Sequence, residues 1–457
     1  MPEAESTSPR AGFTEGPVGR HLWRLGSFMA MGTLTMNVAQ MAEAVYLGIL
    51  GTEALAAMGF AFPLTITLFA FAGGIGSGAS SVIARAVGAG ERERAALLIT
   101  HAQTLGLLIG LVLAVAGYVW AREIVATLGA KDLVLELTVE YLRVYMLGVP
   151  FFMLSIVGST LLRATGSAAS PGVVMTVGSV IQIALGPVLI FGWFGIPELG
   201  IAGAAWAYVI SRVASVGLYG VLLVKARMMA WDFIDITGSW SSIMHVGGPA
   251  IASGLVMPLS MLFITRLLAN HGHEVVAAFN VASRVETMSH MILWSCSSSA
   301  EPFVGQNWGA RQFDRVRRAI YLCHSFCLIW GVVTFVFMVS FGAFLVSLID
   351  DNPIVVETSE MFFLCIPLSI GFMGMMQVAN GSFNARGLPR PALVISVLRS
   401  IVVGIPLAIW GDMLWGATGI FIATAVTNVM VGMLAWYWNR QSIEQQARQV
   451  GGLAAVA

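Results

Sequence analysis

Long apolar stretches separated by short polar segments make up most of the chain. The stretches have few charges and hold about 20 to 25 residues, the length that a helix needs to cross roughly 30 Å of hydrocarbon. The pattern predicts twelve membrane-spanning helices, at residues 22–49, 54–84, 96–120, 136–162, 171–194, 201–224, 243–268, 275–303, 316–348, 356–383, 391–410 and 416–437. The expected fold class is therefore an all-α membrane protein.

The second half of the chain repeats the first. Residues 51–60 read GTEALAAMGF, and 221 positions later residues 272–281 read GHEVVAAFNV. Glycines match in the same register, or in one shortened by five residues: Gly88 with Gly309, Gly166 with Gly387, and Gly200 with Gly416. A duplicated apolar chain is typical of transporters that bind substrate between their halves. Because each half has an even number of spans, both halves start on the same side of the membrane, and we expect parallel repeats.

Composition and charge place this chain in a bilayer and orient it. Hydrophobic residues make up 57% of the sequence and charged residues 11%, with a mean hydropathy of +0.83, so a soluble fold could not hide the apolar surface. Near the ends of the spans, only Arg122, Lys131 and Arg266 fall on the side opposite the termini, against seventeen Lys and Arg on the terminal side. The positive-inside rule then places both termini in the cytoplasm, with the chain in the inner (plasma) membrane. The net charge of zero gives no reason to expect a nucleic-acid partner.

The spans divide the chain into five regions. These are a cytoplasmic tail at 1–21, a six-helix lobe at 22–225, a cytoplasmic linker at 226–242, a second six-helix lobe at 243–438 and a cytoplasmic tail at 439–457. The first tail lacks the apolar core of a signal peptide. The linker, which contains RMMAWDFIDITGSW, is either an amphipathic surface segment or a plain connector.

The sequence lacks the residues that several kinds of chemistry require. Neither of the two lysines, Lys131 and Lys225, follows the glycine-rich spacing of a phosphate-binding loop, so we expect no ATP binding. The run GGIGSGAS at 73–80 lies inside an apolar span, where small residues let helices approach closely. The cysteines lie within spans as apolar filler, and no Cys and His group offers four metal ligands. We expect no metal, no cofactor, no enzymatic activity and a monomer.

An ion gradient is then the expected energy source, and it requires a coordinating or titratable group inside the membrane. Glu43 lies in the first span, with Gln40 and Asn37 one and two turns earlier on the same helical face. This arrangement favours Glu43 as an ion-coupling acid. The alternative is a carboxylate that reaches the outer interface, because the helix ends near Gly48.

A second group of charges lies in the other half. Glu286 is in the middle of the eighth span near Arg284 and His290, and Arg399 enters the eleventh. Glu286 either takes part in transport or pairs with Arg284, and Arg399 either contacts substrate or satisfies a carboxylate or backbone carbonyls. Other polar residues in apolar spans are candidates for a substrate cleft: Asn280, Gln377 and Asn380. Glu301 and Arg85, near the ends of equivalent helices, are interpreted as gate or headgroup-level residues.

Paired sequence motifs resemble those of the multidrug and toxic compound extrusion (MATE) transporters. AEAVYLGILGTEALAAMGFAFPL at 42–64 is similar to the family's first-helix signature. Further similar pieces are IARAVGAGERERA (83–95) with FVGQNWGARQFDRV (303–316), RATGSAASP (163–171) with NARGLPRP (384–391), and LGIAGAAWAYVISR (199–212) with WGATGIFIATAVTN (415–428). The resemblance covers about residues 22–440. It implies two six-helix lobes around a V-shaped cleft, and export of organic cations and other amphiphiles against proton or sodium flow.

The resemblance also assigns residues and exposes departures. Glu43 takes the place of the family's first-helix aspartate, whereas the family's frequent Asn-x-x-x-Asp and a Thr become Gln182, Gly186 and Tyr208. The acids of the sodium-coupled NorM branch are replaced by Met257 and Gly374. Sodium needs several hard oxygen ligands, whereas a proton needs one carboxylate. We therefore expect proton coupling, with sodium as the alternative, and a place nearer the DinF-like branch.

The sequence thus predicts a proton-coupled antiporter that exports small amphiphilic or cationic compounds by alternating access. Expected ion-coupling residues are Glu43, Gln40, Gln182 and Tyr208, and expected cleft residues are Asn37, Asn280, Glu286, His290, Gln377, Asn380 and Arg399. A lipid-linked saccharide flippase is an alternative, although its cavity should be strongly basic and the spans hold only Arg143, Arg212, Arg284 and Arg399. A non-transporting membrane receptor or scaffold would not require an intramembrane acid or two matched lobes.

Overall fold

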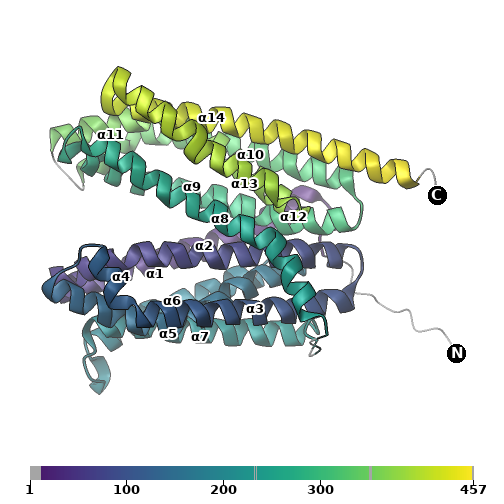
Figure 1. Cartoon of the computed structure of the whole chain (residues 1–457), viewed down its shortest axis with the longest axis horizontal. Helices are drawn as coiled ribbons and strands as arrows, with labels where there is room; N and C mark the ends of the chain where they lie inside the picture. Colours follow the sequence, from purple (N-terminus) through teal and green to yellow (C-terminus); the bar gives the residue numbers. More distant parts are fainter. Residues whose placement is uncertain (1–11, 231, 233, 349–351, 455–457) are drawn as a thin grey trace.

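The structure is a computed structural model that describes residues 12–230, 232, 234–348 and 352–454. Within these residues every regular element is a helix (Figure 1). Parts of the two predicted tails (1–11 and 455–457) and Trp231 and Phe233 of the predicted linker lie outside the described residues.

The helices form two bundles, one from each half of the chain. The first bundle, called the N-lobe, contains α1 (Val18–Leu50), α2 (Thr52–Gly88), α3 (Arg92–Val119), α4 (Ala121–Thr127), α5 (Asp132–Ala164), α6 (Ser170–Ile190), the short η1 (Trp193–Gly195) and α7 (Gly200–Lys225). The second, called the C-lobe, contains α8 (Ile236–Ala269), α9 (His273–Gly309), α10 (Phe313–Ser347), α11 (Pro353–Cys365), η2 (Pro367–Ser369), α12 (Ile370–Ala385), α13 (Pro389–Val397), the π-helix η3 (Leu398–Val403) and α14 (Gly404–Ala454).

The helices account for all twelve predicted spans. Nine helical stretches in the described chain are long and apolar enough to cross a membrane. One of them, Pro389–Gln449, contains two spans, because the backbone leaves helical geometry at Trp415 and Gly416. The other two spans are α1 and α9, which are long enough but carry more polar residues. The predicted twelve-helix fold is confirmed.

Most helices extend a few residues beyond the predicted spans, because hydropathy identifies only the part of a helix that lies in lipid. The largest difference is in α14, which runs to Ala454 where a tail was expected from residue 439. Arg386 holds this extension. Its guanidinium donates hydrogen bonds to Asn439 Oδ1 (2.7 Å), Ser442 Oγ (3.0 Å) and Gln446 Oε1 (3.1 Å).

The described residues of the predicted linker form no helix before Ile236, where α8 begins. They are tied to α3 instead. The His101 ring lies 2.9 Å from both Ser239 Oγ and the carbonyl oxygen of Asp232, and Trp240 Nε1 donates to the His101 carbonyl at 2.9 Å. In this part of the chain the segment is a packed connector between the lobes.

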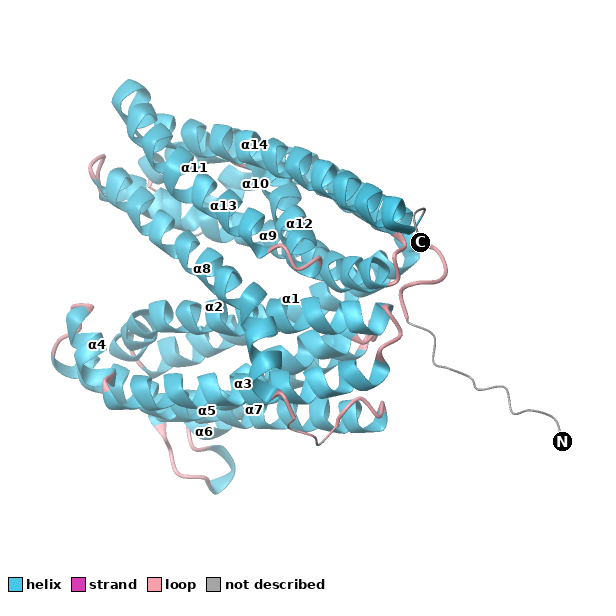
Figure 2. Ribbon diagram, turned by 45° about the vertical axis from the view of Figure 1, so that its right-hand side comes forward, coloured by secondary structure: helices cyan, strands magenta, loops and turns pink. Residues whose placement is uncertain are grey.

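The lobes meet at the end of the molecule where α1 begins and α14 ends, and they diverge toward the other end (Figure 2). We call these ends the terminus face and the opposite face. The glycine run of α2 makes the contact possible, because a Cβ on Gly78 would overlap the carbonyl oxygen of Ile243, and one on Gly74 would lie 2.7 Å from the backbone nitrogen of Ile251. Gly74 and Gly78 thus provide the close helix packing expected of this run.

The contact at the terminus face occurs twice, with the halves exchanged. A Cβ on Gly88 would overlap the carbonyl oxygen of Gln306, and a Cβ on Gly309 would overlap that of Arg85. The 221-residue offset relates Gly88 to Gly309 and Arg85 to Gln306. The same contact made in both directions is expected for parallel repeats related by a two-fold axis.

Polar contacts add to this closure. Ser77 Oγ donates to Glu301 Oε1 at 2.6 Å, and Ser81 Oγ donates to the carbonyl oxygen of Asn384 at 2.5 Å. Both bonds run from α2 in the N-lobe to the C-lobe. Glu301 therefore lies in the contact between the lobes, in line with its interpretation as a gate residue.

Residues 12–16, the N-terminal strap, are packed against the C-lobe at the same face. Phe13 is 1% exposed, and its ring lies 6.1 Å from that of Phe303. The Phe13 N–H donates to Gln306 Oε1 at 3.1 Å, and its carbonyl oxygen accepts from the Arg315 guanidinium at 2.9 Å. Gln306 in turn donates to the carbonyl oxygen of Ala164 in the N-lobe at 2.8 Å. Because the strap leads into α1, it links the two lobes.

Replacing Phe13 by Ala is expected to destabilise this closed arrangement. Removal of a fully buried Phe side chain costs about 3–5 kcal/mol. The thermal unfolding midpoint of the purified protein should fall, and trypsin should cut more readily at Arg20 and Arg24. Phe194→Ala is the control, since that ring is 90% exposed. Equal behaviour of the two variants would show that the strap does not contribute to closure.

Candidate ion and substrate sites

Helix α1 places the Glu43 carboxylate inside the N-lobe, where the residue is 8% exposed. Oε1 accepts a hydrogen bond from the Tyr141 hydroxyl on α5 at 2.8 Å, and Oε2 accepts one from Gln182 Nε2 on α6 at 3.0 Å. The carboxylate thus joins three helices. Both of its oxygens are bonded inside the lobe, which argues against the alternative of an interfacial side chain.

Arg212 on α7 completes this network. One of its terminal nitrogens donates to Gln182 Oε1 at 3.3 Å, so the guanidinium is connected to Glu43 through Gln182. A cation and an acid buried in the same lobe reduce each other's cost of burial, which is large for a lone charge.

Three tyrosine rings form one wall beside the acid. The rings of Tyr141 and Tyr145 are stacked with centroids 5.7 Å apart, and those of Tyr145 and Tyr208 with centroids 4.3 Å apart. The Arg212 guanidinium lies 5.1 Å from the Tyr208 ring centroid, a cation–π distance. Tyr208 therefore acts on the site through its ring, as a support for Arg212.

Gly186, at the position of the family's second acid, has no room for a side chain. A Cβ at this position would lie 2.8 Å from Cε2 of Tyr46. The Tyr46 hydroxyl is fixed by donating to the carbonyl oxygen of Ile183 at 3.3 Å. The packing of Tyr46 explains why this lobe has one acid where the family pattern has two.

A cavity of about 250 Å³ borders this network in the N-lobe. All four predicted ion-coupling residues line this cavity: Glu43, Gln40, Gln182 and Tyr208. Gln40 is exposed and sits beside the acid without a hydrogen bond to it among the described contacts. The other lining residues are mainly Met and aromatic side chains: Met36, Met58, Phe62, Phe69, Tyr141, Tyr145 and Phe152.

The C-lobe holds a larger cavity of about 360 Å³, which brings together Glu286, His290 and Arg399. Helix α9 supplies the first two and η3 the third. Arg399 Nε donates to Asn428 Oδ1 at 2.9 Å, and a terminal nitrogen lies 3.5 Å from Met373 Sδ. Thr33 of α1 also borders this cavity, so it lies where the two lobes face each other.

Glu286 does not pair with Arg284, although the two are close in sequence. Residues two positions apart point to different sides of a helix, and Arg284 is exposed outside the cavity. Arg399, in contrast, lines the same cavity as Glu286. Of the two explanations for Glu286, pairing with Arg284 is therefore not supported.

The remaining predicted cleft residues do not line either cavity. Gln377 Nε2 lies 2.7 Å from His290 Nε2, so Gln377 contacts a residue that lines the C-lobe cavity. Asn380 Nδ2 donates to Ser396 Oγ at 3.3 Å. Asn37 and Asn280 each donate to a carbonyl oxygen of their own helix, Thr33 and Val276, at 2.9 Å.

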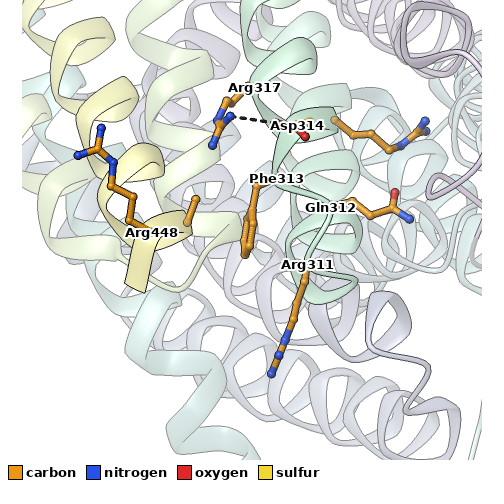
Figure 3. Close-up of a pocket in the computed structure, with 8 residues that line it drawn as sticks. Arg311, Gln312, Phe313, Asp314, Arg317 and Arg448 are labelled. Atoms are coloured by element: carbon orange, nitrogen blue, oxygen red, sulfur yellow. Dashed lines mark hydrogen bonds and ion pairs between the residues drawn. The ribbon is translucent and has the colours of Figure 1, made fainter. Parts of the chain in front are cut away.

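A third cavity, of about 450 Å³, lies at the terminus face between the α9–α10 turn and the end of α14. Arg311, Arg317 and Arg448 border it, but their side chains do not converge on one point (Figure 3). Arg317 is paired with Asp314 at 2.9 Å. This is the arrangement of a solvated charged surface.

The sequence did not single out Tyr141 and Arg212 as site residues. A tyrosine hydroxyl inside a membrane helix needs a partner, and a membrane-embedded arginine needs a carboxylate or an acceptor network. From these signals Tyr141 and Arg212 could have been predicted as partners of Glu43, the one acid in the middle of this lobe's spans.

Sequence comparison links the chain to known transporters. The profile of the MatE family matches residues 29–188 and 249–410. The chain is 32% identical over 432 residues to a protein of Shewanella oneidensis named FAD transporter, covering 94% of this chain and 96% of that protein. It is 30% identical to the probable multidrug resistance protein YoeA of Bacillus subtilis (85% and 86% covered) and 23% identical to the multidrug export protein MepA of Staphylococcus aureus (93% and 94%).

Solved structures show the same fold. The MATE transporter VcmN of Vibrio cholerae superposes with a TM-score of 0.90 at 26% identity, covering 94% of this chain and 98% of that one. A transporter of the MOP superfamily from Pyrococcus furiosus superposes with a TM-score of 0.88 at 23% identity, with 96% and 99% covered. With two matched six-helix lobes and a profile match in each half, the chain belongs to the MatE family of membrane transporters.

Proposed function

We propose that this chain is a proton-coupled antiporter of the inner membrane that exports amphiphilic organic compounds by alternating access, with both termini in the cytoplasm. Family membership supports a secondary transporter. Relatives named as a FAD transporter and as multidrug export proteins support organic substrates. With this orientation, the closed terminus face makes the described conformation outward-facing.

The Glu43 network is the observation that carries the proton-coupling proposal. Its two oxygens accept hydrogen bonds from the Tyr141 hydroxyl and the Gln182 amide nitrogen, so the carboxylate faces two donors. A hard cation such as sodium prefers several oxygen ligands around it. A single buried carboxylate suits a proton better, which also supports a place nearer the DinF-like branch than the NorM branch.

The C-lobe supports the same choice. At Gly374, one of the two positions aligned with the NorM acids, a Cβ would lie 2.9 Å from Leu293 Cδ2 and 3.0 Å from Cys327 Sγ. A side chain at this position would require Leu293 and Cys327 to shift. Met257, the other position, lines the C-lobe cavity with a thioether, which is a soft ligand.

Protonation of Glu43 would change how the N-lobe helices are held. The ionised carboxylate accepts two hydrogen bonds and balances Arg212, whereas the protonated group is neutral and must itself donate one. The two forms therefore favour different packings of α1 against α5, α6 and α7. A ligand that binds two conformations with different free energies shifts their populations, and here the proton is that ligand.

Efflux from proteoliposomes tests this function. Vesicles loaded with ethidium or FAD should release the compound under an imposed pH gradient without sodium. A sodium gradient at uniform pH should give no release. Release under the sodium gradient alone would establish the sodium-coupled alternative, and movement of a lipid-linked saccharide instead of either compound would establish the flippase alternative.

Replacing Tyr141 by Phe should slow pH-driven efflux by roughly tenfold, because a hydrogen bond to a charged group contributes about 1.5–3 kcal/mol. The phenyl ring keeps the stacking with Tyr145 and removes only the hydroxyl that donates to Glu43. Tyr118→Phe is the matched control, since that residue is 44% exposed. Equal initial rates for both variants would show that the Tyr141 hydroxyl does not support coupling.

A further inference from the structure

The two cavities occupy equivalent places in the two repeats. The 221-residue register relates Glu43 to Ile264 and Thr65 to Glu286, and the shortened register relates Arg212 to Asn428. The first residue of each pair lines the N-lobe cavity and the second lines the C-lobe cavity. Each repeat therefore contains a cavity at the same place, and the two cavities are lined by different residues.

Each cavity holds one acid and one arginine, but on different helices. The N-lobe pair is on α1 and α7, and the C-lobe pair is on α9 and η3. No member of either pair is aligned with a charged residue of the other lobe. The counterparts of Glu43, Glu286 and Arg212 are Ile264, Thr65 and Asn428, and that of Arg399 is Gly178 or Ile183 in the two registers. The acid and the arginine thus occupy positions that are not equivalent in the two repeats.

The two pairs differ in their hydrogen-bond partners within the protein. In the N-lobe, Arg212 and Glu43 are connected through Gln182, and each oxygen of the acid already accepts one hydrogen bond. In the C-lobe, the described contacts include no hydrogen bond to the Glu286 carboxylate. Arg399 is anchored through Nε to Asn428, and one of its two terminal nitrogens has no hydrogen-bond partner among them. The C-lobe pair therefore retains an acceptor and a donor for a ligand.

The rest of the C-lobe cavity suits a flat ring. Phe279, Phe362 and Trp294 contribute aromatic faces, and Met257, Met261 and Met291 contribute flexible thioethers. An apolar cavity with a few placed polar groups is the usual form of a small-molecule site. A purely cationic ligand would meet the Arg399 charge as well as the Glu286 charge, so this cavity has no net preference for cations.

We propose that the C-lobe cavity binds the substrate, and that this substrate is a flat aromatic compound carrying both an anionic group, which Arg399 binds, and an N–H or amino donor, which Glu286 accepts. Flavin and purine nucleotides have this chemistry. The N-lobe cavity then serves the proton and the C-lobe cavity the substrate. The term substrate rests on the proposed function, whereas binding at this site does not require it.

Binding to the purified full-length protein, without any gradient, tests the inference. Quenching of flavin fluorescence would report binding of FAD and of riboflavin, which has the same ring and no phosphate. Arg399→Gln should weaken FAD binding by roughly 10- to 100-fold, the effect of losing a charged hydrogen bond. Riboflavin binding should change by less than about threefold, because its ring contacts remain.

Arg284→Gln is the matched control, since it removes an exposed arginine two residues before Glu286 on α9, and its FAD affinity should equal that of the natural chain. Arg399→Lys keeps the charge and should recover most of the FAD affinity, which separates a lost contact from a misfolded cavity. Glu286→Gln should weaken FAD and riboflavin alike, by several-fold.

Three results would overturn the inference: FAD affinity unchanged in Arg399→Gln, equal loss of FAD and riboflavin affinity in that variant, or binding of ethidium but not of FAD by the natural chain. If the natural chain binds FAD through Arg399 but moves no compound under a pH gradient, the site stands and the proposed transport function fails. If ethidium is exported under a pH gradient and FAD is not bound, the transport function stands and the substrate class fails.

Discussion

Replacement of Glu43 by Gln is expected to abolish export driven by a pH gradient and to leave substrate binding measurable. The amide has nearly the same shape as the protonated acid, but it does not ionise. The ionised form costs several kcal/mol in an apolar surround unless its partners are in place, so the two states differ in the packing they favour. A difference of about 5.5 kcal/mol between the free energies with which a ligand binds the two states is enough to move their equilibrium from 1:99 to 99:1.

The related variants sharpen this prediction. Glu43→Asp keeps a titratable group on a shorter side chain, which reaches Tyr141 and Gln182 less well, so partial transport should remain. Glu286→Gln should reduce pH-driven efflux of ethidium less than Glu43→Gln does, because Glu286 has no part in the N-lobe network. Undiminished pH-driven efflux by the Glu43→Gln protein would remove Glu43 from the coupling mechanism.

Replacement of Gly88 by Ala is expected to prevent closure of the terminus face and to reduce transport at least about tenfold. The added Cβ would overlap the carbonyl oxygen of Gln306, a backbone atom that cannot move aside alone. Over-packing of this kind typically costs about 1–3 kcal/mol or more, and here it acts on one conformation of the cycle. The protein should therefore accumulate with the terminus face open.

Labelling distinguishes this effect from simple misfolding. A single cysteine at Ser81, in a background without the four native cysteines, should react faster with a water-soluble maleimide when Gly88 is Ala. Gly73→Ala is the matched control on the same helix, because a Cβ there meets no atom within 4 Å. Normal transport by Gly88→Ala would show that the contact between Gly88 and Gln306 is not needed in the transport cycle.

The sequence predicted the fold well because membrane helices are specified by local signals. Apolar length identified all twelve spans, and the repeat register matched Gly88 with Gly309, which the structure places in equivalent contacts. The predicted span ends and the helix ends differ where helices leave the lipid. The extension of α14 beyond residue 437 depends on hydrogen bonds from Arg386, which is distant in sequence and gives no hydropathy signal.

The candidate sites were predicted less completely, because they depend on which helix faces which. Glu43 was identified as an intramembrane acid, and the structure joins it to Gln182 by a hydrogen bond. Tyr141 was missed, because its meaning depends on α5 packing beside α1. Asn37 and Asn280 were included as polar residues in apolar spans, but their side chains bond to their own helices. An amide in a membrane helix can satisfy itself locally, so polarity alone does not mark a cleft.

Charge was the most ambiguous signal. Arg284 and Glu286 are neighbours in sequence, yet only Glu286 lines the C-lobe cavity, and it shares that cavity with Arg399. Helical geometry excludes a pairing at a spacing of two residues, whereas the approach of η3 to α9 follows only from the folded bundle.

Proton release on substrate binding tests the central claim most directly. The claim is that Glu43 carries the proton that is exchanged for substrate. In weakly buffered solution, addition of FAD or ethidium to the purified natural chain should release protons, as read by a pH indicator, and the same addition to the Glu43→Gln protein should release none although the compound still binds. Equal proton release by both proteins would contradict the account, because it would assign the exchanged proton to another group.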